Sequence, residues 1–247
     1  MKILTDFHTH TIYSKNSHGK GTIRDNVESA ISKGLKELWI TDHGPSHIMF
    51  GIKRDKFKEV RKEIDRLNSE YKGKIKIYFG VESNVMNYFG ANDITNEELK
   101  YLDGVNLGFH YGIINNDLKS FFYFWIINPL SRIFKGIQPW IREKNTDALI
   151  NIIKNRDIKI ITHPGDKVQV NIKRLADACV QYNTALEINS SHENLSEDDL
   201  NKLKESRVRF SVGSDAHNPA DIGDFNQALK RINRVGISHE RIINMKE

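Results

Sequence analysis

The sequence has little cysteine and no long hydrophobic run. The single cysteine among 247 residues, Cys179, rules out an intramolecular disulfide framework and favours a reducing compartment, so we expect a cytoplasmic protein. Cys179 lies on the apolar stripe of an expected helix, and we predict that it is part of the core. The most apolar run, residues 121–127, is far too short to cross a bilayer, and we expect neither a membrane span nor a signal peptide.

The excess of basic residues is small, and we favour a solvated surface over a nucleic-acid patch as its interpretation. The net charge is +5, but acidic residues interleave with the basic ones in helical stretches such as residues 54–71. This pattern is typical of a solvated helix face. With 38% hydrophobic and 28% charged residues, the composition is that of a soluble globular protein.

Short strand patterns alternate with helical patterns along the chain. Helical spacing of apolar residues predicts helices at 23–34, 54–71, 145–156, 172–182, 196–206 and 220–235. Runs of β-branched and aromatic residues predict strands at 2–7, 36–41, 74–81, 103–109, 158–162, 184–188 and 208–213. This alternation predicts the α/β class with a parallel sheet, and we favour closure of the sheet into a barrel.

Residues 111–144 interrupt this alternation. The segment is rich in aromatic residues and contains Pro129 and Pro139. A long connection inside a compact domain is often a lid or a binding loop. We therefore expect a single domain over residues 1–247 with an insertion at about 111–144. A lid, a helical excursion packed on the barrel and a subunit contact are all open interpretations of that insertion.

Metal-ligating residue types follow every expected strand. Since the carboxyl ends of parallel strands share one face, and in a barrel one mouth, these side chains are expected to converge. Residues two apart on a strand point to the same side, so His8 and His10 can face one ion, as can Asp215 and His217. A lone pair of this kind is usually accidental, but the recurrence at successive strand ends favours a site for zinc, manganese or iron. The strand-end residues are Asp6, His8, His10, Asp42, His43, Glu82, His110, His163, Glu187, Asn189, Asp215 and His217.

Seven short motifs, in chain order, resemble those of the PHP (polymerase and histidinol phosphatase) superfamily. They are "DFHTHT", "ITDHGP", "GVESN", "GFH", "THPG", "ALEINSS" and "GSDAH". The resemblance covers nearly the whole chain and is greatest to stand-alone bacterial phosphatases of the YcdX type. It implies a distorted (β/α)7 barrel that holds a cluster of three divalent metal ions at the C-terminal face of its strands.

The resemblance also implies which residues bind the metals. His8, His10, Glu82 and Asp215 would bind the first ion. Glu82 would bridge to a second ion, which His110 and His163 complete. The third ion would be held by His18, His43 and His217, where His18 comes from a loop rather than from a strand end.

Three divalent ions with only two carboxylate ligands would leave a surplus of positive charge that suits a phosphate ester. We predict that a hydroxide bridging two of the ions attacks phosphorus, and that Glu82, Asp215 and His217 are catalytic. Asp6 and Asp42 are expected to orient ligand imidazoles, although capping of a loop is an alternative role for both.

Three basic side chains are candidates for binding the substrate phosphate. Lys167 follows His163 closely in "HPGDK" and is the first choice, ahead of Arg24 and Arg54. His47 and His192 also fall on loops near the expected mouth, where we interpret them as incidental. Asn189 is expected to fix its own loop.

The favoured function is metal-dependent hydrolysis of a phosphomonoester, with a small phosphorylated metabolite as substrate. A phosphodiesterase or 3′–5′ exonuclease is the first alternative. It calls for a basic groove with stacking aromatic residues, and the segment 119–142 has aromatic residues with a few arginines and lysines. A metal-binding scaffold without activity is the second alternative, and the complete set of ligand residues argues against it. The sequence does not select the metabolite.

Overall fold

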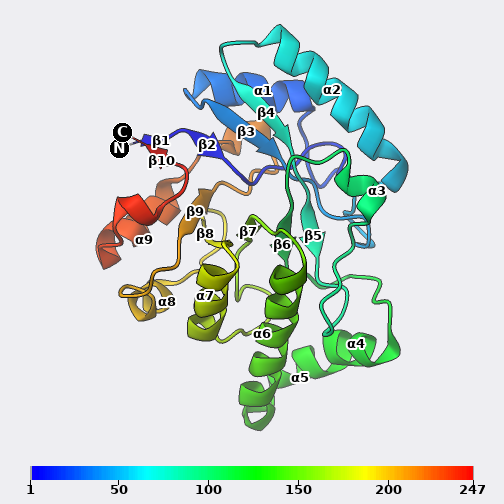
Figure 1. Cartoon of the computed structure of the whole chain (residues 1–247), viewed down its shortest axis with the longest axis vertical. Helices are drawn as coiled ribbons and strands as arrows, with labels where there is room; N and C mark the ends of the chain where they lie inside the picture. The colour runs from blue at the N-terminus through cyan, green and yellow to red at the C-terminus, as the bar shows by residue number, and fades with distance from the viewer. Residues whose placement is uncertain (1, 247) are drawn as a thin grey trace.

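The computed structural model describes residues 2–246, and nearly all of its strands run parallel. Strands β2, β3 and β4 pair in that order to form one parallel sheet, and strands β5 to β9 pair in order to form a second (Figure 1). The strands are β1 (Lys2–Ile3), β2 (Thr5–Asp6), β3 (Glu37–Ile40), β4 (Lys76–Phe79), β5 (Glu82–Asn84), β6 (Asn106–Gly108), β7 (Ile160–Ile161), β8 (Ala185–Asn189), β9 (Phe210–Gly213) and β10 (Met245–Lys246). The predicted parallel α/β architecture is confirmed.

The two parallel sheets are joined by single bridges. His43, which follows β3, pairs with Glu82 at the start of β5, and Thr9, which follows β2, pairs with Ala216, which follows β9. The pairing therefore consists of two sheets with isolated links, and closure of a barrel stays a prediction.

The third expected strand, 74–81, is divided into β4 and β5. β4 pairs with β3 in the first sheet, while β5 pairs with β6 in the second. Gly80 lies at the change of sheet, where an added Cβ would come within 2.9 Å of side-chain atoms of Thr41 and Trp39. A residue with a side chain would not fit at this crossing without displacement of its neighbours.

The ends of the described chain meet in a strand pair that the sequence did not predict. β1 and β10 are antiparallel, with Lys2 opposite Lys246, and the two termini lie side by side (Figure 1). β1 lies within the expected strand 2–7, whereas β10 was not expected, because its two residues are too few to show alternation of apolar and polar side chains.

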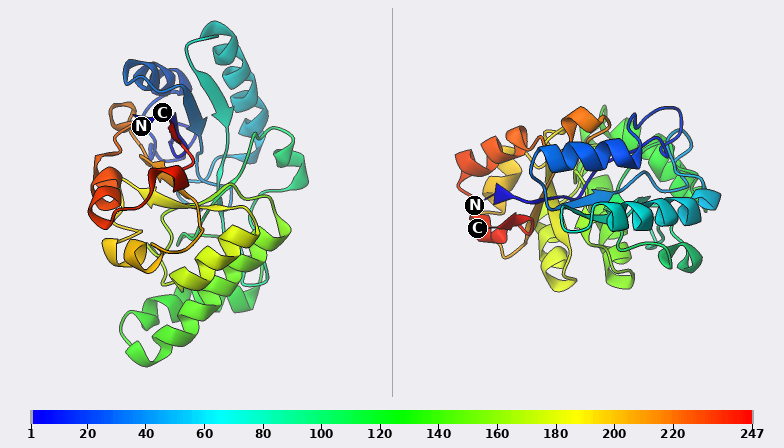
Figure 2. Two further views of the ribbon diagram at one scale, coloured as in Figure 1. Left: turned by 60° about the vertical axis from the view of Figure 1, so that its left-hand side comes forward. Right: turned by 90° about the horizontal axis from the view of Figure 1, so that it is seen from above.

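The helices lie around the outside of the strands (Figure 2). Their starts follow capping chemistry: Thr22 accepts from the Asp25 amide at the start of α1, and Asn171 accepts from the Arg174 amide at the start of α7. α9 ends at Gly236, whose φ of 76° is in the left-handed region. The helices are α1 (Ile23–Ser32), α2 (Phe57–Glu70), α3 (Asn96–Leu99), α4 (Leu118–Phe122), α5 (Asn128–Ser131), α6 (Gln138–Asn155), α7 (Ile172–Gln181), α8 (Glu197–Lys202) and α9 (Asn226–Val235).

The segment 111–144 is largely helical. α4, a π-helix at Tyr123–Ile127 and α5 follow one another without a break, and a 3-10 helix at Lys135–Ile137 leads into α6. α6 begins seven residues before the expected helix at 145–156, because Pro139 lies in its first turn, where a missing N–H leaves no hydrogen bond unmade. None of the helices in residues 2–246 combines the length and apolar character needed to cross a membrane.

The core lies between the helices and the strands. β8 and β9 are buried along their whole length, which is typical of parallel strands that are covered on both faces. α2 contributes Phe57, Val60, Ile64 and Leu67 to this core from a single face. Cys179 is fully buried as predicted, and burial raises the pKa of its thiol.

Candidate metal centre

The structure brings all nine predicted metal ligands into one cluster at the carboxyl ends of the parallel strands. Four overlapping groups have potential ligand atoms within 4.8 Å of one another: His10–His43–His217, His8–His163–Asp215, His8–His10–Glu82 and His43–Glu82–His110. His18, the loop residue, joins the cluster through His217, since their Nε2 atoms lie 2.8 Å apart. His18 and His217 are partly exposed, whereas the other seven predicted ligands are buried.

Glu82 lies at the centre of the cluster, and histidines approach both of its oxygens. Oε1 lies 2.9 Å from His163 Nε2 and 3.1 Å from His110 Nε2. Oε2 lies 2.9 Å from His43 Nδ1. Burial on its own would raise the pKa of Glu82, but His110, His8 and His43 together hold it well below its usual range. Glu82 is therefore an anion with one oxygen facing each of two groups of histidines.

Asp215 makes the second acidic contact with the histidines. Its Oδ1 lies 3.2 Å from His10 Nε2 and 3.4 Å from His8 Nε2. Asp215 and His163 have backbone φ angles of 53° and 26°, which residues other than glycine rarely adopt. Such conformations persist only where the surroundings enforce them, and they gather at functional sites.

Neighbouring groups fix the orientation of several imidazoles. His8 Nδ1 lies 2.8 Å from Glu187 Oε1, and His110 Nδ1 lies 2.8 Å from Asn84 Oδ1. His217 Nδ1 lies 2.9 Å from the Asp215 carbonyl oxygen. An oxygen acceptor at Nδ1 leaves Nε2 of each ring free to bind an ion, which is the arrangement that orients histidine ligands in metalloproteins.

Several buried polar atoms of the cluster make no hydrogen bond of good geometry within residues 2–246, although His43 Nδ1 and Glu82 Oε2 lie 2.9 Å apart. The atoms without such a bond are His10 Nδ1, His43 Nδ1, Glu82 Oε2 and His110 Nε2. Buried polar atoms are rarely left without a partner, because the loss of hydration costs about 1–3 kcal/mol for each. Imidazole nitrogens and carboxylate oxygens are ligands of zinc, iron and manganese, so this donor set fits divalent cations.

Glu187 is not among the predicted ligands, but it contacts two of them, His8 and His163. It is buried, its Oε1 lies against His8, and its Oε2 accepts from the His163 amide at 2.9 Å. Asn189 donates to Glu187 Oε2 at 2.9 Å and to Asp215 Oδ2 at 3.2 Å, while its Oδ1 accepts from the Ser191 and His192 amides. Asn189 thus fixes its loop, as predicted, and also contacts the cluster.

His192, which we interpreted as incidental from the sequence, contacts two buried or partly buried carboxylates. Its Nε2 lies 3.3 Å from Asp215 Oδ2 and its Nδ1 lies 3.4 Å from Asp166 Oδ2. Hydrogen bonds with Asp166 and Asp215 raise the pKa of His192 to about 9. No motif marked this residue, because Asp166 and Asp215 come from two other loops.

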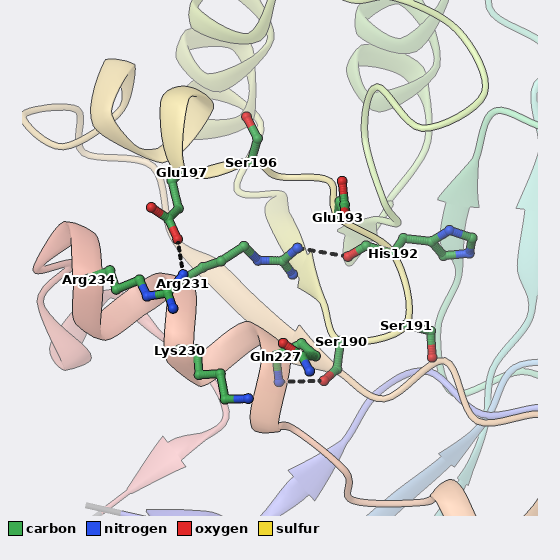
Figure 3. Close-up of a pocket in the computed structure, with 10 residues that line it drawn as sticks. All are labelled: Ser190, Ser191, His192, Glu193, Ser196, Glu197, Gln227, Lys230, Arg231 and Arg234. Carbon is green, nitrogen blue, oxygen red and sulfur yellow. Dashed lines mark hydrogen bonds and ion pairs between the residues drawn. The ribbon is translucent and has the colours of Figure 1, made fainter.

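A cavity of about 530 Å³ lies behind the loop that carries His192. Figure 3 shows Arg231 of α9 reaching across this cavity, with the His192 ring pointing away from it. Arg231 donates to the His192 carbonyl oxygen at 2.8 Å and also to the Asn189 carbonyl oxygen. Arg231 therefore fixes the backbone of the loop 189–192, from which the His192 side chain reaches Asp215.

Asp6 and Asp42 do not orient imidazoles, so the first role predicted for them is wrong. Asp42 accepts from the Thr11 amide at 2.8 Å and from the hydroxyls of Thr11 and Ser14. Asp6 accepts from the backbone amides of His8, Ser214 and Gly223. Both buried carboxylates cap loops, because unpaired amides at strand ends need acceptors.

The predicted phosphate-binding residues are paired with other groups. Arg24 makes two short contacts with Glu70, at 2.6 and 2.7 Å, and Arg54 pairs with Glu98. Lys167 lies 2.6 Å from Asp166, which contacts His192 and so connects Lys167 to the edge of the cluster. The assignment of Lys167, Arg24 and Arg54 to the substrate stays a prediction.

The chain matches a protein-family model and is similar to relatives over nearly its whole length. The model of the PHP domain matches residues 6–191. A protein from Thermoanaerobacter sp. strain X514, named "Probable phosphatase", is 33% identical over an alignment that covers 99% of this chain and 91% of the relative. A protein of the same name from Shewanella frigidimarina is 31% identical, with 99% of this chain and 90% of the relative covered.

A solved structure has a similar fold. It is the histidinol phosphate phosphatase of Lactococcus lactis, in complex with zinc, L-histidinol and phosphate. The superposition has a TM-score of 0.62 at 19% identity and covers 96% of this chain and 95% of that protein.

Proposed function

The chain belongs to the PHP domain family, and on that premise we propose that it is a metal-dependent phosphomonoesterase that acts on a small phosphorylated metabolite. Its full-length relatives are named as phosphatases, and a protein of similar fold has been crystallised with zinc and phosphate. The observation that supports the proposal most strongly is the position of Glu82, whose two oxygens face different groups of histidines.

The residues that would hold three divalent ions fall into three sets around Glu82. His8, His10, Asp215 and Glu82 form the first set, and Glu82 is shared with the second, which His110 and His163 complete. His18, His43 and His217 form the third. When bound, such ions lower the pKa of a coordinated water, supply a hydroxide nucleophile and neutralise charge on phosphate oxygens.

The chain's own groups would prepare this chemistry in two ways. Glu187 and Asn84 turn the Nε2 atoms of His8 and His110 toward Glu82, so those rings need not reorient when a metal binds. Glu187 also adds a third negative charge beside Glu82 and Asp215. Three divalent ions would then leave a surplus of three positive charges, which favours a phosphomonoester dianion over the singly charged phosphodiester.

We further propose that the two parallel sheets form one distorted (β/α)7 barrel in a single domain, with an insertion at about 111–144. The bridges His43–Glu82 and Thr9–Ala216 support this, because each links neighbouring strands across the gap between the sheets. The cluster would then lie at the barrel mouth, where active sites of such folds are found. Lys167 contacts Asp166, which in turn contacts His192, and we retain Lys167 as the candidate for substrate binding.

A substrate comparison tests the proposed function. Purified protein is treated with chelator, reconstituted with zinc or manganese, and assayed on p-nitrophenyl phosphate, bis(p-nitrophenyl) phosphate and a panel of phosphorylated metabolites. We expect faster hydrolysis of the monoester than of the diester, and one or a few metabolites well above the rest. Faster cleavage of the diester, together with release of nucleotides from single-stranded DNA, would replace the proposal with the exonuclease alternative.

A further inference from the structure

The helical segment from α4 to the start of α6 carries a concentration of exposed large apolar side chains. Leu118 and Ile133 are 83% and 73% exposed, and Phe134 is 58% exposed. Phe122, Trp125 and Ile126 are also exposed. These six side chains define what we call the outer surface of the segment, and Figure 1 shows α4 and α5 at the periphery of the molecule. Leu118, Phe122, Trp125 and Ile126 recur at the spacing of one helix face along the continuous helical run 118–131, and an exposed apolar face often marks a binding site.

The opposite side of the same segment is anchored to the core. The Phe124 ring stacks on Phe109 with ring centroids 4.7 Å apart. Asn128 donates to the Tyr88 hydroxyl at 2.9 Å and accepts from Asn145 at 2.9 Å. Because this inner side is fixed by packing and hydrogen bonds, the outer surface cannot turn inward to bury its apolar side chains.

The charges within the segment are basic, and the acids at its two ends make contacts within the chain: Asp117 caps α4, and Glu143 pairs with Arg174. Residues 118–142 contain no aspartate or glutamate, whereas they contain Lys119, Arg132, Lys135 and Arg142. Lys119, Arg132 and Lys135 are exposed. This differs from the other exposed helices, such as α2, where acids pair with the basic residues. A partner that binds the outer surface should therefore present both apolar groups and negative charge.

We propose that the outer surface binds the headgroup region of a lipid bilayer that contains anionic phospholipid. In this arrangement α4 and α5 lie in the plane of the interface, and Phe122, Ile133 and Phe134 enter the boundary of the acyl chains. Trp125 and the exposed Trp140 suit the headgroup level, where tryptophan is enriched. Lys119 and Lys135 contact lipid phosphates. The inference concerns association with a surface and does not depend on the metal chemistry.

A second copy of the chain fits this surface less well. In a symmetric dimer through the outer surface, the same patch meets itself, so the lysines Lys119 and Lys135 of one chain come near the basic side chains of the other. Since residues 118–142 provide no carboxylate to pair with them, like charges would be buried together at a cost. An anionic membrane surface places the opposite charge against each of them.

Vesicle cosedimentation of the full chain tests the proposal. The vesicles are phosphatidylcholine alone and a mixture of phosphatidylcholine with phosphatidylglycerol, at low and high salt. We expect binding to the anionic vesicles, weakened by high salt because screening shortens the electrostatic range. The double substitution Phe122→Ser/Ile133→Ser should weaken binding by about tenfold or more. Lys119→Gln and Lys135→Gln should each weaken it by about fivefold.

Matched controls replace the same residue types elsewhere on the surface. Leu99→Ser/Val180→Ser removes exposed apolar side chains from α3 and α7, and Lys72→Gln/Lys74→Gln removes two exposed lysines from the turn before β4. Both controls should bind vesicles like the wild type. Circular dichroism of every variant shows whether it has folded.

Two results would exclude binding to a bilayer of any composition. One is that the folded wild-type chain stays in the supernatant with both kinds of vesicle. The other is that light scattering shows a dimer that Phe122→Ser/Ile133→Ser converts to monomer, without any binding to vesicles, which would assign the surface to a second copy. Equal binding to neutral and anionic vesicles would contradict the choice of anionic lipid.

Discussion

His8 Nδ1 lies 2.8 Å from Glu187 Oε1, although 179 residues separate them in the sequence. This contact turns His8 Nε2 toward Glu82 and Asp215, from which it lies 3.4 Å in each case. Because Oε2 of the same carboxylate holds the His163 amide, Glu187 connects two of the loops that supply proposed ligands.

Glu187→Ala should therefore weaken metal binding without abolishing it. Loss of a group that orients a ligand commonly costs 10- to 100-fold in metal affinity or activity. Glu187→Gln keeps an oxygen acceptor for His8 and should lose less. Competition with a fluorescent zinc chelator measures both affinities, and thermal unfolding shows whether each variant is folded. Unchanged affinity in a folded Glu187→Ala protein would mean that Glu187 does not orient a ligand.

Glu82→Gln should have a larger effect than any other single substitution in the cluster. It removes the charge that two groups of histidines share, so we expect the loss of at least one ion and a fall in activity of roughly 100-fold or more. Glu98→Gln is the matched control, because Glu98 is also buried but caps α3 and pairs with Arg54. Plasma mass spectrometry of both proteins gives the metal content. Full metal content together with full activity in Glu82→Gln would exclude a bridging role.

Binding of metal should release protons near neutral pH. In the metal-free protein, burial would by itself lower the pKa of His8, but Asp215, Glu187 and Glu82 raise it well above its ordinary value. His8 is then protonated near pH 7 and must lose that proton to bind a cation, so metal affinity should rise with pH. Burial instead lowers the pKa of His110 and of His18 to about 4, so neither contributes at neutral pH.

Calorimetric titration with zinc in buffers of different ionisation enthalpy measures this release. The slope of the observed binding enthalpy against the ionisation enthalpy of the buffer gives the number of protons released. A value of about one or more agrees with a charged His8. An enthalpy that is the same in all buffers at neutral pH would show that His8 is already neutral.

Two neighbouring phenylalanines in the segment 111–144 should differ in their effect on stability. Phe124 is 1% exposed and packs on Phe109 and Tyr88, whereas Phe122 is 46% exposed. Phe124→Ala should reduce the free energy of unfolding by about 3–5 kcal/mol, and Phe122→Ala should change it by about 0.5 kcal/mol or less. Urea unfolding of both variants makes the comparison. Similar losses would mean that the outer surface is covered by other parts of the chain.

Lys167→Met should raise KM for the best phosphomonoester substrate by roughly 3- to 10-fold, since a single partly exposed cation contributes modestly to the binding of an anion. Lys72→Met is the control, because it replaces an exposed lysine of the turn before β4 that is not a candidate for the substrate site. Steady-state kinetics of the two variants distinguishes them. An equal change in KM, or none, would remove Lys167 from the substrate site.

The sequence predicted the alternation of strands and helices and the residues that meet at the strand ends, because both follow from local patterns and from parallel topology. It did not predict Glu187 as a partner of His8 or Asp166 as a partner of His192, since these contacts depend on which loops become neighbours. It also did not predict the division of the third strand at Gly80, which arises from the close approach of Thr41 and Trp39. The wrong role for Asp6 and Asp42 has the same origin, because backbone amides at strand ends compete with imidazoles for buried carboxylates.

The most direct test of the central claim is a titration of metal-free protein with zinc or manganese, in which hydrolysis of p-nitrophenyl phosphate is followed against the number of ions bound per chain. The account predicts no hydrolysis without metal and a rise in rate that continues until the three proposed sets of ligands are filled. Full activity with a single ion bound would contradict the cluster of three ions, and hydrolysis by the metal-free chain would contradict the metal-dependent mechanism itself.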